Sequence, residues 1–271
     1  MVKIKKINNI VVRPPPTREE DKRPVRGSNY FEDAYCNIFI NARKRSGKTV
    51  TVYNIMKQCI SKDTTVIIFC STVYKDANYR AMQDYLDKKG INYLVYTSIK
   101  DGDIDHLKDL YETLKMKAEE DFMAEDEEPK KKEINFCDSD GDDDCVVKRR
   151  KSKFKPLDYF IIFDDLSNEL KNPNLTLLLK NHRHFLSKII VSSQYYCDIA
   201  PESRNQFDYI LVFKNIIQDK LMVLHKEADL NISYEMFEKI YSWSTKPEYS
   251  FLYIDTRRCK FRRNFNLEIE V

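Results

Sequence analysis

The sequence lacks the patterns of a zinc cluster, a disulfide framework and a membrane span. Its seven cysteines are scattered along 271 residues and no two form a CxxC pair, so neither metal-binding fingers nor paired bridges are indicated. The N-terminal stretch MVKIKKINNI is not apolar enough for a signal peptide. The longest apolar runs, such as 189–191, are far too short to cross a bilayer. With Cys36 and Cys70 inside apolar runs, we expect a soluble, intracellular protein in a reducing compartment, with no membrane contact.

The composition that is present favours one folded unit with long solvated segments. Hydrophobic residues make up 42% and aromatic residues 12% of the chain, enough for a packed core. Charged residues reach 33%, whereas the net charge of +3 is too small to indicate a partner. No internal repeat is visible. The length suits one substantial α/β domain with additional segments.

Buried strands alternate with amphipathic helices along most of the chain. Apolar runs rich in β-branched residues predict strands at 34–41, 64–71, 92–97, 158–163, 188–193, 208–213 and 250–255. Helical periodicity and end signals predict helices at 48–60, 76–89, 104–118 after an Asp103 cap, 173–186 and 233–243. This alternation is typical of an α/β fold with a central, mostly parallel sheet flanked by helices.

Two segments stand apart from this pattern. Residues 1–27 contain Pro14-Pro15-Pro16 between charged flanks and are expected to form an extended arm before a domain at 28–271. Residues 119–144 carry thirteen acidic side chains, and the run KRRKSKFK at 148–155 is strongly basic. Such a block cannot bury enough apolar area to offset the entropy of ordering it. We expect a disordered insertion at about 119–155, either a solvated loop or a segment that mimics or repels nucleic acid.

A phosphate-binding loop is indicated between the first strand and the first helix. Residues 42–49 read ARKRSGKT, which matches GxxxxGK[ST] except that Ala42 replaces the first glycine. Ser46 and Gly47 would let backbone N–H groups surround a phosphate at the start of a helix. Lys48 would contact the β and γ phosphates of ATP, and Thr49 would bind Mg²⁺. The loop survives the substitution provided that Ala42 need not adopt a positive φ.

Three basic residues, Arg43, Lys44 and Arg45, fill the middle of this loop. Guanidinium and ammonium groups at that place would add phosphate contacts or face an incoming polymer. The alternative is plain solvent exposure, and the sequence does not decide between the two.

Two adjacent carboxylates follow an apolar strand, in the sequence FIIFDD at 160–165. Ligands of open α/β sheets bind beyond the carboxyl ends of the strands. Asp164 is therefore placed to hold Mg²⁺, and Asp165 to orient or deprotonate the attacking water. One of the two could instead cap the following helix.

Four blocks in order resemble the poxvirus-type DNA-packaging ATPases of large DNA viruses and virophages, within the FtsK/HerA superfamily. The blocks are ARKRSGKT, FIIFDDL, NHRHFLSKIIVSSQ and PESRNQFDYILVFKN. The resemblance covers most of 34–255 without the insertion. It implies a RecA-like sheet, a homo-oligomeric ring, and ATP-driven movement of double-stranded DNA into a capsid built of viral proteins. It also implies a place in the cytoplasmic virus factory of the host cell and in the virion.

The same resemblance suggests three further catalytic residues. Gln194 matches the polar sensor of the family, whose amide would contact the γ-phosphate or the attacking water. Arg204 matches an arginine that would reach the ATP of a neighbouring subunit as an arginine finger, and Arg183 is the competing candidate. A surface ion pair is the alternative for both arginines. His184 fits the Arg-His pair of the family but, as a lone histidine, is expected to be structural.

Other functions remain open on the sequence alone. A small-molecule kinase also needs a phosphate-binding loop, but it would need an arginine-bearing lid that is not evident. A non-translocating scaffold that binds ATP would not need Asp165 or Gln194. For DNA contact, a weak candidate is the basic strip Arg257, Arg258, Lys260, Arg262 and Arg263, which would meet the backbone phosphates irrespective of base sequence.

Overall fold

The computed structural model describes residues 21–127 and 153–271. Of the expected arm, residues 21–27 are described and contain neither helix nor strand; the remainder lies outside the described residues. Most of the expected insertion lies outside them as well.

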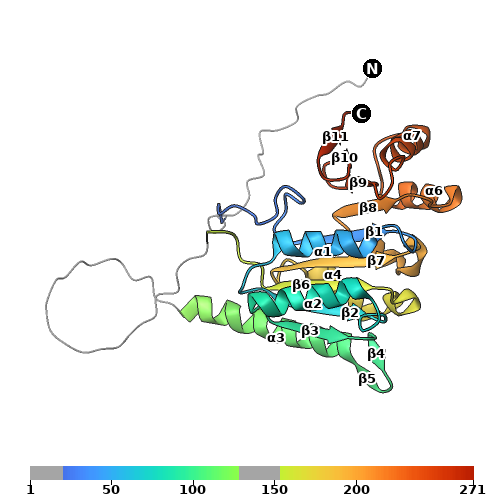
Figure 1. The fold of residues 1–271 in the computed structure, drawn as a ribbon. Helices are drawn as coiled ribbons and strands as arrows, with labels where there is room; N and C mark the ends of the chain where they lie inside the picture. Colours follow the sequence, from blue (N-terminus) through green and yellow to red (C-terminus); the bar gives the residue numbers. More distant parts are fainter. Residues whose placement is uncertain (1–20, 128–152) are drawn as a thin grey trace, which may run out of the picture.

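The described residues build an α/β fold around a nine-stranded sheet, with strand order β11-β10-β9-β8-β1-β7-β6-β2-β3 (Figure 1). Strands β8, β1, β7, β6, β2 and β3 run parallel, and β9, β10 and β11 add an antiparallel edge. The sheet strands are β1 (Cys36–Asn41), β2 (Thr65–Cys70), β3 (Tyr93–Tyr96), β6 (Tyr159–Asp164), β7 (Ser187–Ser193), β8 (Tyr209–Phe213), β9 (Phe251–Asp255), β10 (Lys260–Arg263) and β11 (Leu267–Ile269).

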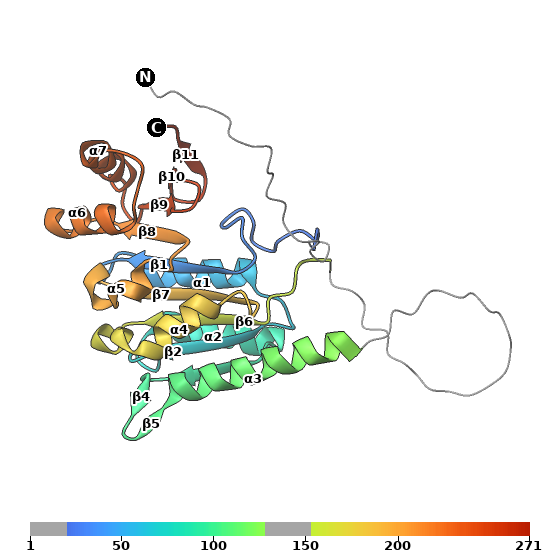
Figure 2. The same ribbon diagram turned by 180° about the vertical axis from the view of Figure 1, so that it is seen from behind.

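Helices cover both faces of this sheet. Helices α1 (Lys48–Cys59) and α2 (Ala77–Lys89) lie on one face, and α3 (His106–Glu127) and α4 (Pro173–Asn181) lie on the other (Figures 1 and 2). Shorter or more peripheral elements are η1 (Ser167–Lys171), η2 (Tyr196–Asp198), α5 (Pro201–Arg204), α6 (Gln218–Glu227), α7 (Tyr234–Ser244) and the hairpin of β4 (Lys100–Asp101) and β5 (Ile104–Asp105).

Alternating side chains of the central strands feed two hydrophobic cores. In β1, Phe39 packs with α3, α4 and α7 residues, whereas Ile38 and Ile40 pack with α1 and α2 residues. Successive strand residues point to opposite faces, and both faces are covered, so the strands read as continuous apolar runs. Burying one such side chain contributes roughly 1.5–3 kcal/mol. These two cores hold the strand ends, and therefore the site, in fixed register.

Most predicted elements are present, and three expectations need correction. The third helix begins at His106, because residues 100–105 form a hairpin and Asp105, not Asp103, caps it by accepting a hydrogen bond from the Lys108 N–H at 2.9 Å. That helix continues to Glu127, so the first part of the expected insertion is helical. Helix α4 ends at Asn181 rather than at 186, because a turn with Leu186 at φ 45° closes the helix before β7.

Candidate functional site

The carboxyl ends of four neighbouring strands meet at one edge of the sheet. Asn41 pairs in register with Ser193, and Asp164 pairs with both Ser192 and Cys70. β7 therefore separates the loop after β1 from the carboxylates after β6. Below, we call this border of the sheet the carboxyl edge.

The loop after β1 does not need a glycine at its first position. Ala42 is fully buried, its N–H donates to the Ser193 carbonyl at 3.1 Å, and its φ is negative. The left-handed conformations fall instead at Arg45, with φ 62°, and at Gly47, with φ 89°. A methyl group added at Gly47 would lie 3.3 Å from the Tyr249 ring, in a conformation that already disfavours a side chain. The glycine required here is therefore Gly47.

Lys48 at the start of α1 lies directly against the two carboxylates at the end of β6. Its Nζ is 2.6 Å from Asp164 Oδ1 and 3.6 Å from Asp165 Oδ1, and its side chain is only 12% exposed. Burial alone lowers the pKa of Lys48, but the attraction of Asp164 and Asp165 outweighs it and raises that pKa. The ammonium group therefore stays charged in a largely buried position.

A tyrosine that the sequence did not single out completes this group. The Tyr79 hydroxyl of α2 donates to Asp164 Oδ2 at 2.8 Å, and the tyrosine is fully buried. Burial and the charge of Asp164 hold the pKa of Tyr79 well above its usual value, so the hydroxyl remains a donor. On α2, Tyr79 reads as an ordinary apolar-face residue, which leaves no sequence signal for this contact.

These groups face an open cavity of about 570 Å³, within the range of ligand sites. Its wall carries most of the predicted loop residues, together with both carboxylates: Arg43, Lys44, Arg45, Gly47, Lys48, Thr49, Asp164 and Asp165. The Thr49 hydroxyl and the Asp164 carboxylate are the hard oxygen donors that Mg²⁺ prefers, so the residues present fit this metal. Phosphate groups in this cavity would also meet the N-terminus of α1.

Gln194 lies next to this site, and Asp165 lines both the site and the cavity that contains Gln194. Both residues line a smaller adjacent cavity of about 160 Å³, and Asp165 also lines the larger one. The Asn41 side chain donates to the Gln194 carbonyl at 3.0 Å, which ties the segment after β7 to the end of β1. Asp165 itself has a φ of 58°, a conformation that costs energy for a residue other than glycine. The structure thus brings together the loop, both carboxylates and Gln194.

Arg204 lies apart from these groups and is engaged within its own chain. Its side chain is 9% exposed, its Nε donates to the Ile199 carbonyl at 2.8 Å, and its Nη1 lies 2.8 Å from both carboxylate oxygens of Glu227. Such a buried, charge-assisted contact is a structural brace. The arginine-finger role of Arg204 stays a prediction.

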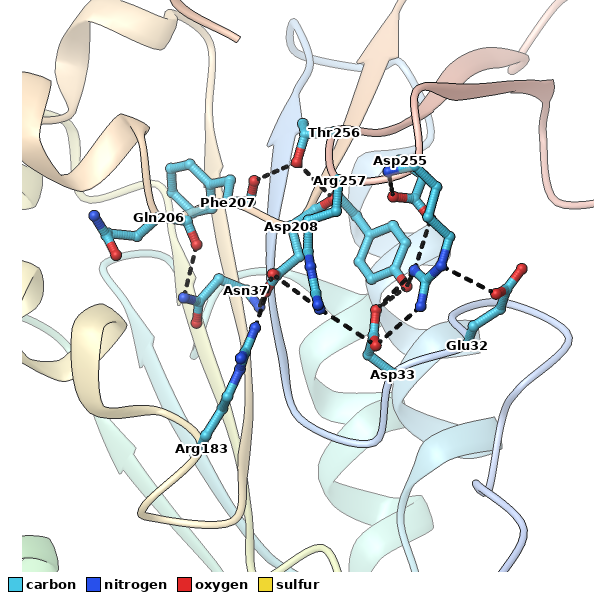
Figure 3. Close-up of polar contacts among 12 residues, drawn as sticks. Glu32, Asp33, Asn37, Arg183, Gln206, Phe207, Asp208, Asp255, Thr256 and Arg257 are labelled. Carbon is cyan, nitrogen blue, oxygen red and sulfur yellow. Dashed lines mark hydrogen bonds and ion pairs between the residues drawn. The ribbon is translucent and has the colours of Figure 1, made fainter. Parts of the chain in front are cut away.

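Arg183 lies at the opposite border of the sheet, called the amino edge below, where β1 and β8 begin (Figure 3). Its guanidinium is 3.7 Å from Asp208 Oδ1 and its side chain is 56% exposed. The Asn37 N–H donates to the other oxygen of Asp208 at 2.9 Å. Within one subunit, Arg183 is therefore not part of the cavity at Lys48, although its guanidinium is open to a partner.

The expected basic strip at the C-terminal strands is largely paired with acids. Arg258 lies 3.0 Å from Asp33 and 2.9 Å from Asp255, and Lys260 and Arg262 both approach Glu32. Arg263 stacks over the Trp243 ring, with 4.1 Å from its guanidinium carbon to the ring centroid. Only part of this positive charge is free to meet a polyanion.

Comparison with known proteins shows the fold. No protein-family model matches the chain. The genome-packaging NTPase B204 of Sulfolobus turreted icosahedral virus 2, solved with ATP-γ-S, is 17% identical, with a TM-score of 0.51 over 86% of this chain and 97% of that one. The DNA-packaging ATPase B204 of Sulfolobus turreted icosahedral virus is 19% identical, with a TM-score of 0.53 over 84% of this chain and 96% of that one.

One curated protein also matches in part. Phosducin-like protein 1 of Dictyostelium discoideum is 31% identical over 147 residues, which are 53% of this chain and 43% of that protein. The chain thus spans less than half the length of this relative.

The comparisons establish the class of fold. The chain is an α/β protein whose mostly parallel sheet, flanked by helices, matches that of a P-loop packaging NTPase. Within the described residues, no helix is long and apolar enough to cross a bilayer.

Proposed function

We propose that this chain hydrolyses ATP and uses the energy to move double-stranded DNA into a viral capsid as a subunit of a homo-oligomeric ring. The observation that carries the proposal is the 2.6 Å contact of Lys48 with Asp164, beside Asp165, at the open carboxyl edge. Viral packaging NTPases of the same fold, one of them solved with an ATP analogue, support it. Membership of the poxvirus-type group stays part of the proposal.

Each residue of the site has a distinct task in this reaction. Lys48 and the N–H groups of the loop bind the phosphates and neutralise their charge. Thr49 and Asp164 would hold Mg²⁺, which neutralises charge on the β and γ phosphates when bound. Asp165 orients the attacking water and accepts its proton, and the Gln194 amide fixes that water from the adjacent cavity.

The present contact between Lys48 and Asp164 suits this cycle. A phosphate group entering the cavity gives the ammonium group a new anionic partner, so Lys48 can exchange a carboxylate for a phosphate while remaining charged. Asp164 then becomes available to a cation. Tyr79 keeps the Asp164 carboxylate in place during this exchange through its 2.8 Å hydrogen bond.

The decisive assay measures phosphate release from ATP with and without linear duplex DNA. We expect DNA to stimulate the release several-fold, with weaker stimulation as salt rises, because the contacts are to backbone phosphates. Lys48→Ala should abolish hydrolysis, and Lys62→Ala, an exposed lysine just after α1, should not.

Two outcomes would replace the proposal. Transfer of the γ-phosphate to a small acceptor, unaffected by DNA, would favour a kinase. Binding of ATP without any turnover would favour a scaffold.

A further inference from the structure

A further cavity, of about 330 Å³, borders the phosphate-binding loop. One wall is the loop itself, over residues 43–46, and the others are 213–215 at the end of β8 and 248–250 before β9. Arg43, Lys44 and Arg45 line this cavity and the cavity at Lys48 alike. The two cavities are therefore neighbours that share the basic middle of the loop.

An exposed aromatic ring forms part of this cavity. Tyr249 is 66% exposed, although its ring lies against the backbone of Gly47. Its φ of 59° is left-handed, which is uncommon for an aromatic residue. The fold thus holds a large, flat, solvent-facing ring beside the glycine that caps the start of α1, although the core gains little from it.

Polar groups line the same cavity as this ring. The Ser46 hydroxyl oxygen is buried and has no hydrogen-bond partner among the described residues. The exposed Asn215 has a φ of 71°, and Glu248 is exposed beside Tyr249. A flat ring next to amide, hydroxyl and carboxylate groups matches a ligand that has a π face and a hydrogen-bonding edge.

We infer that this cavity binds the base and ribose of the nucleotide whose phosphates lie at Lys48, with the Tyr249 ring against the base. The inference rests on the proposed nucleotide-binding function and specifies its nucleoside subsite. An amide such as that of Asn215 can donate to and accept from one edge of adenine, so the ligand class is a purine nucleoside triphosphate.

The test compares two ligands that share the phosphates and differ in the nucleoside. Calorimetric titrations of the full chain with ATP and with inorganic triphosphate would be run on wild type, Tyr249→Ala and Tyr249→Phe. Stacking of one base on an aromatic ring predicts that Tyr249→Ala weakens ATP binding about tenfold. Triphosphate affinity should stay within about twofold, and Tyr249→Phe should bind both ligands like wild type.

Controls separate this inference from the proposed function. Tyr74→Ala removes another exposed tyrosine, 63% exposed and outside both cavities, and should leave both affinities unchanged. If Tyr249→Ala fails to fold in a thermal melt, Asn215→Ala replaces it, with a smaller loss for ATP alone expected.

Three outcomes would overturn the inference: an equal loss for both ligands, no loss at all, or equal affinity of wild type for ATP and triphosphate. Absence of binding of either ligand to wild type would contradict the proposed function itself.

Discussion

The two edges of the central sheet hold charged groups in opposite ways. At the carboxyl edge, Lys48 and Asp165 line open cavities, and loop residues adopt left-handed conformations. At the amino edge, Asp33 (Figure 3) and the arginine that pairs with it, Arg258, each have several partners within the chain. The comparison teaches that burial of charge alone does not mark a functional site. What distinguishes the carboxyl edge is that Lys48, Asp164 and Asp165 face one cavity beside the N-terminus of α1.

The amino edge ties distant segments of the chain together. The Asp33 carboxylate accepts hydrogen bonds from the Tyr209 hydroxyl at 2.6 Å and from Arg258 at 3.0 Å, and Arg258 also donates to Asp255 at 2.9 Å. The Asn37 side chain donates to backbone carbonyls after α5 and at the end of α4. These contacts connect the segment before β1 with β8, β9 and α4, so we assign this edge to stability.

The largest effect that would separate the two edges is expected from Asp165→Asn. Without the carboxylate the water loses its proton acceptor, and the rate of ATP hydrolysis should fall about 100-fold or more. ATP affinity and the free energy of unfolding should change little, because the Asp165 side chain is one-third exposed and 3.6 Å from Lys48. Phosphate release and urea denaturation measure the two quantities. A protein that loses stability but keeps hydrolysis would place Asp165 with the structural carboxylates.

The reverse pattern, a loss of stability with ATP hydrolysis retained, is expected from Arg258→Ala at the amino edge. The change leaves the buried Asp255 carboxylate, 3% exposed, without its guanidinium partner, and should lower the free energy of unfolding by about 2–3 kcal/mol. Its neighbour Arg257 is a matched control, because its contacts are 3.4 and 3.9 Å and its side chain is 47% exposed. Arg257→Ala should cost less than about 1 kcal/mol in urea denaturation. A loss for Arg258→Ala as small as the loss for Arg257→Ala would mean that the contact with Asp255 does not stabilise the edge.

The carboxyl edge could be predicted from the sequence because its signals are local. A strand, a loop ending in Gly47-Lys48-Thr49 and a helix follow one another, and Asp164-Asp165 directly follow an apolar strand. The left-handed φ could not be assigned to Arg45, because that conformation is set by the path of the loop and not by the side chain.

The amino edge could not be predicted, because its partners are far apart in sequence. Arg258 meets Glu32 and Asp33 across more than 220 residues, so a run of basic residues appeared to be free charge. Glu227 likewise reaches Arg204 from α6, a helix that the sequence pattern did not predict.

Arg204 and Arg183, the two candidates for the arginine finger, allow a sharper comparison of a buried with an exposed arginine. Arg204→Ala removes a guanidinium that is 9% exposed and should lower the free energy of unfolding by about 2 kcal/mol. Arg183→Ala removes one that is 56% exposed, with a loss below about 0.5 kcal/mol.

Mixing subunits tests the finger role itself. Lys48→Ala subunits mixed with subunits that lack the finger should regain part of the ATP hydrolysis, since a ring then holds some intact sites between chains. No recovery at any ratio with Arg183→Ala, together with recovery for Arg204→Ala, would assign the finger to Arg204 despite its burial.

The smallest expected effect is the contribution of His182, at the amino edge, to the pH dependence of the free energy of unfolding. His182 is buried, its Nδ1 lies 2.8 Å from the Leu179 carbonyl oxygen and 3.1 Å from the Asn37 side-chain nitrogen, and its Nε2 has no hydrogen-bond partner among the described residues. Burial lowers the pKa of His182 from 6.5, so below that pH the unfolded chain binds a proton that the folded chain does not. Stability should therefore fall as pH drops from about 7.5 to 6.

His182→Gln should reduce this fall by less than about 1 kcal/mol in urea denaturation. Of the charged groups facing His182, Arg183 keeps its charge over this range. Burial raises the pKa of Asp208 from 3.8, so the folded chain takes up this proton before the unfolded chain does. The effect of Asp208 on stability is therefore opposite in sign to that of His182.

His184→Gln, a change at an exposed neighbour, should leave the wild-type slope of stability against pH unchanged. A steeper slope in His182→Gln would mean that the imidazole is charged in the folded protein and pairs with Asp208, 3.7 Å away. The amino edge would then contain one more ion pair, and its contrast with the carboxyl edge would be stronger.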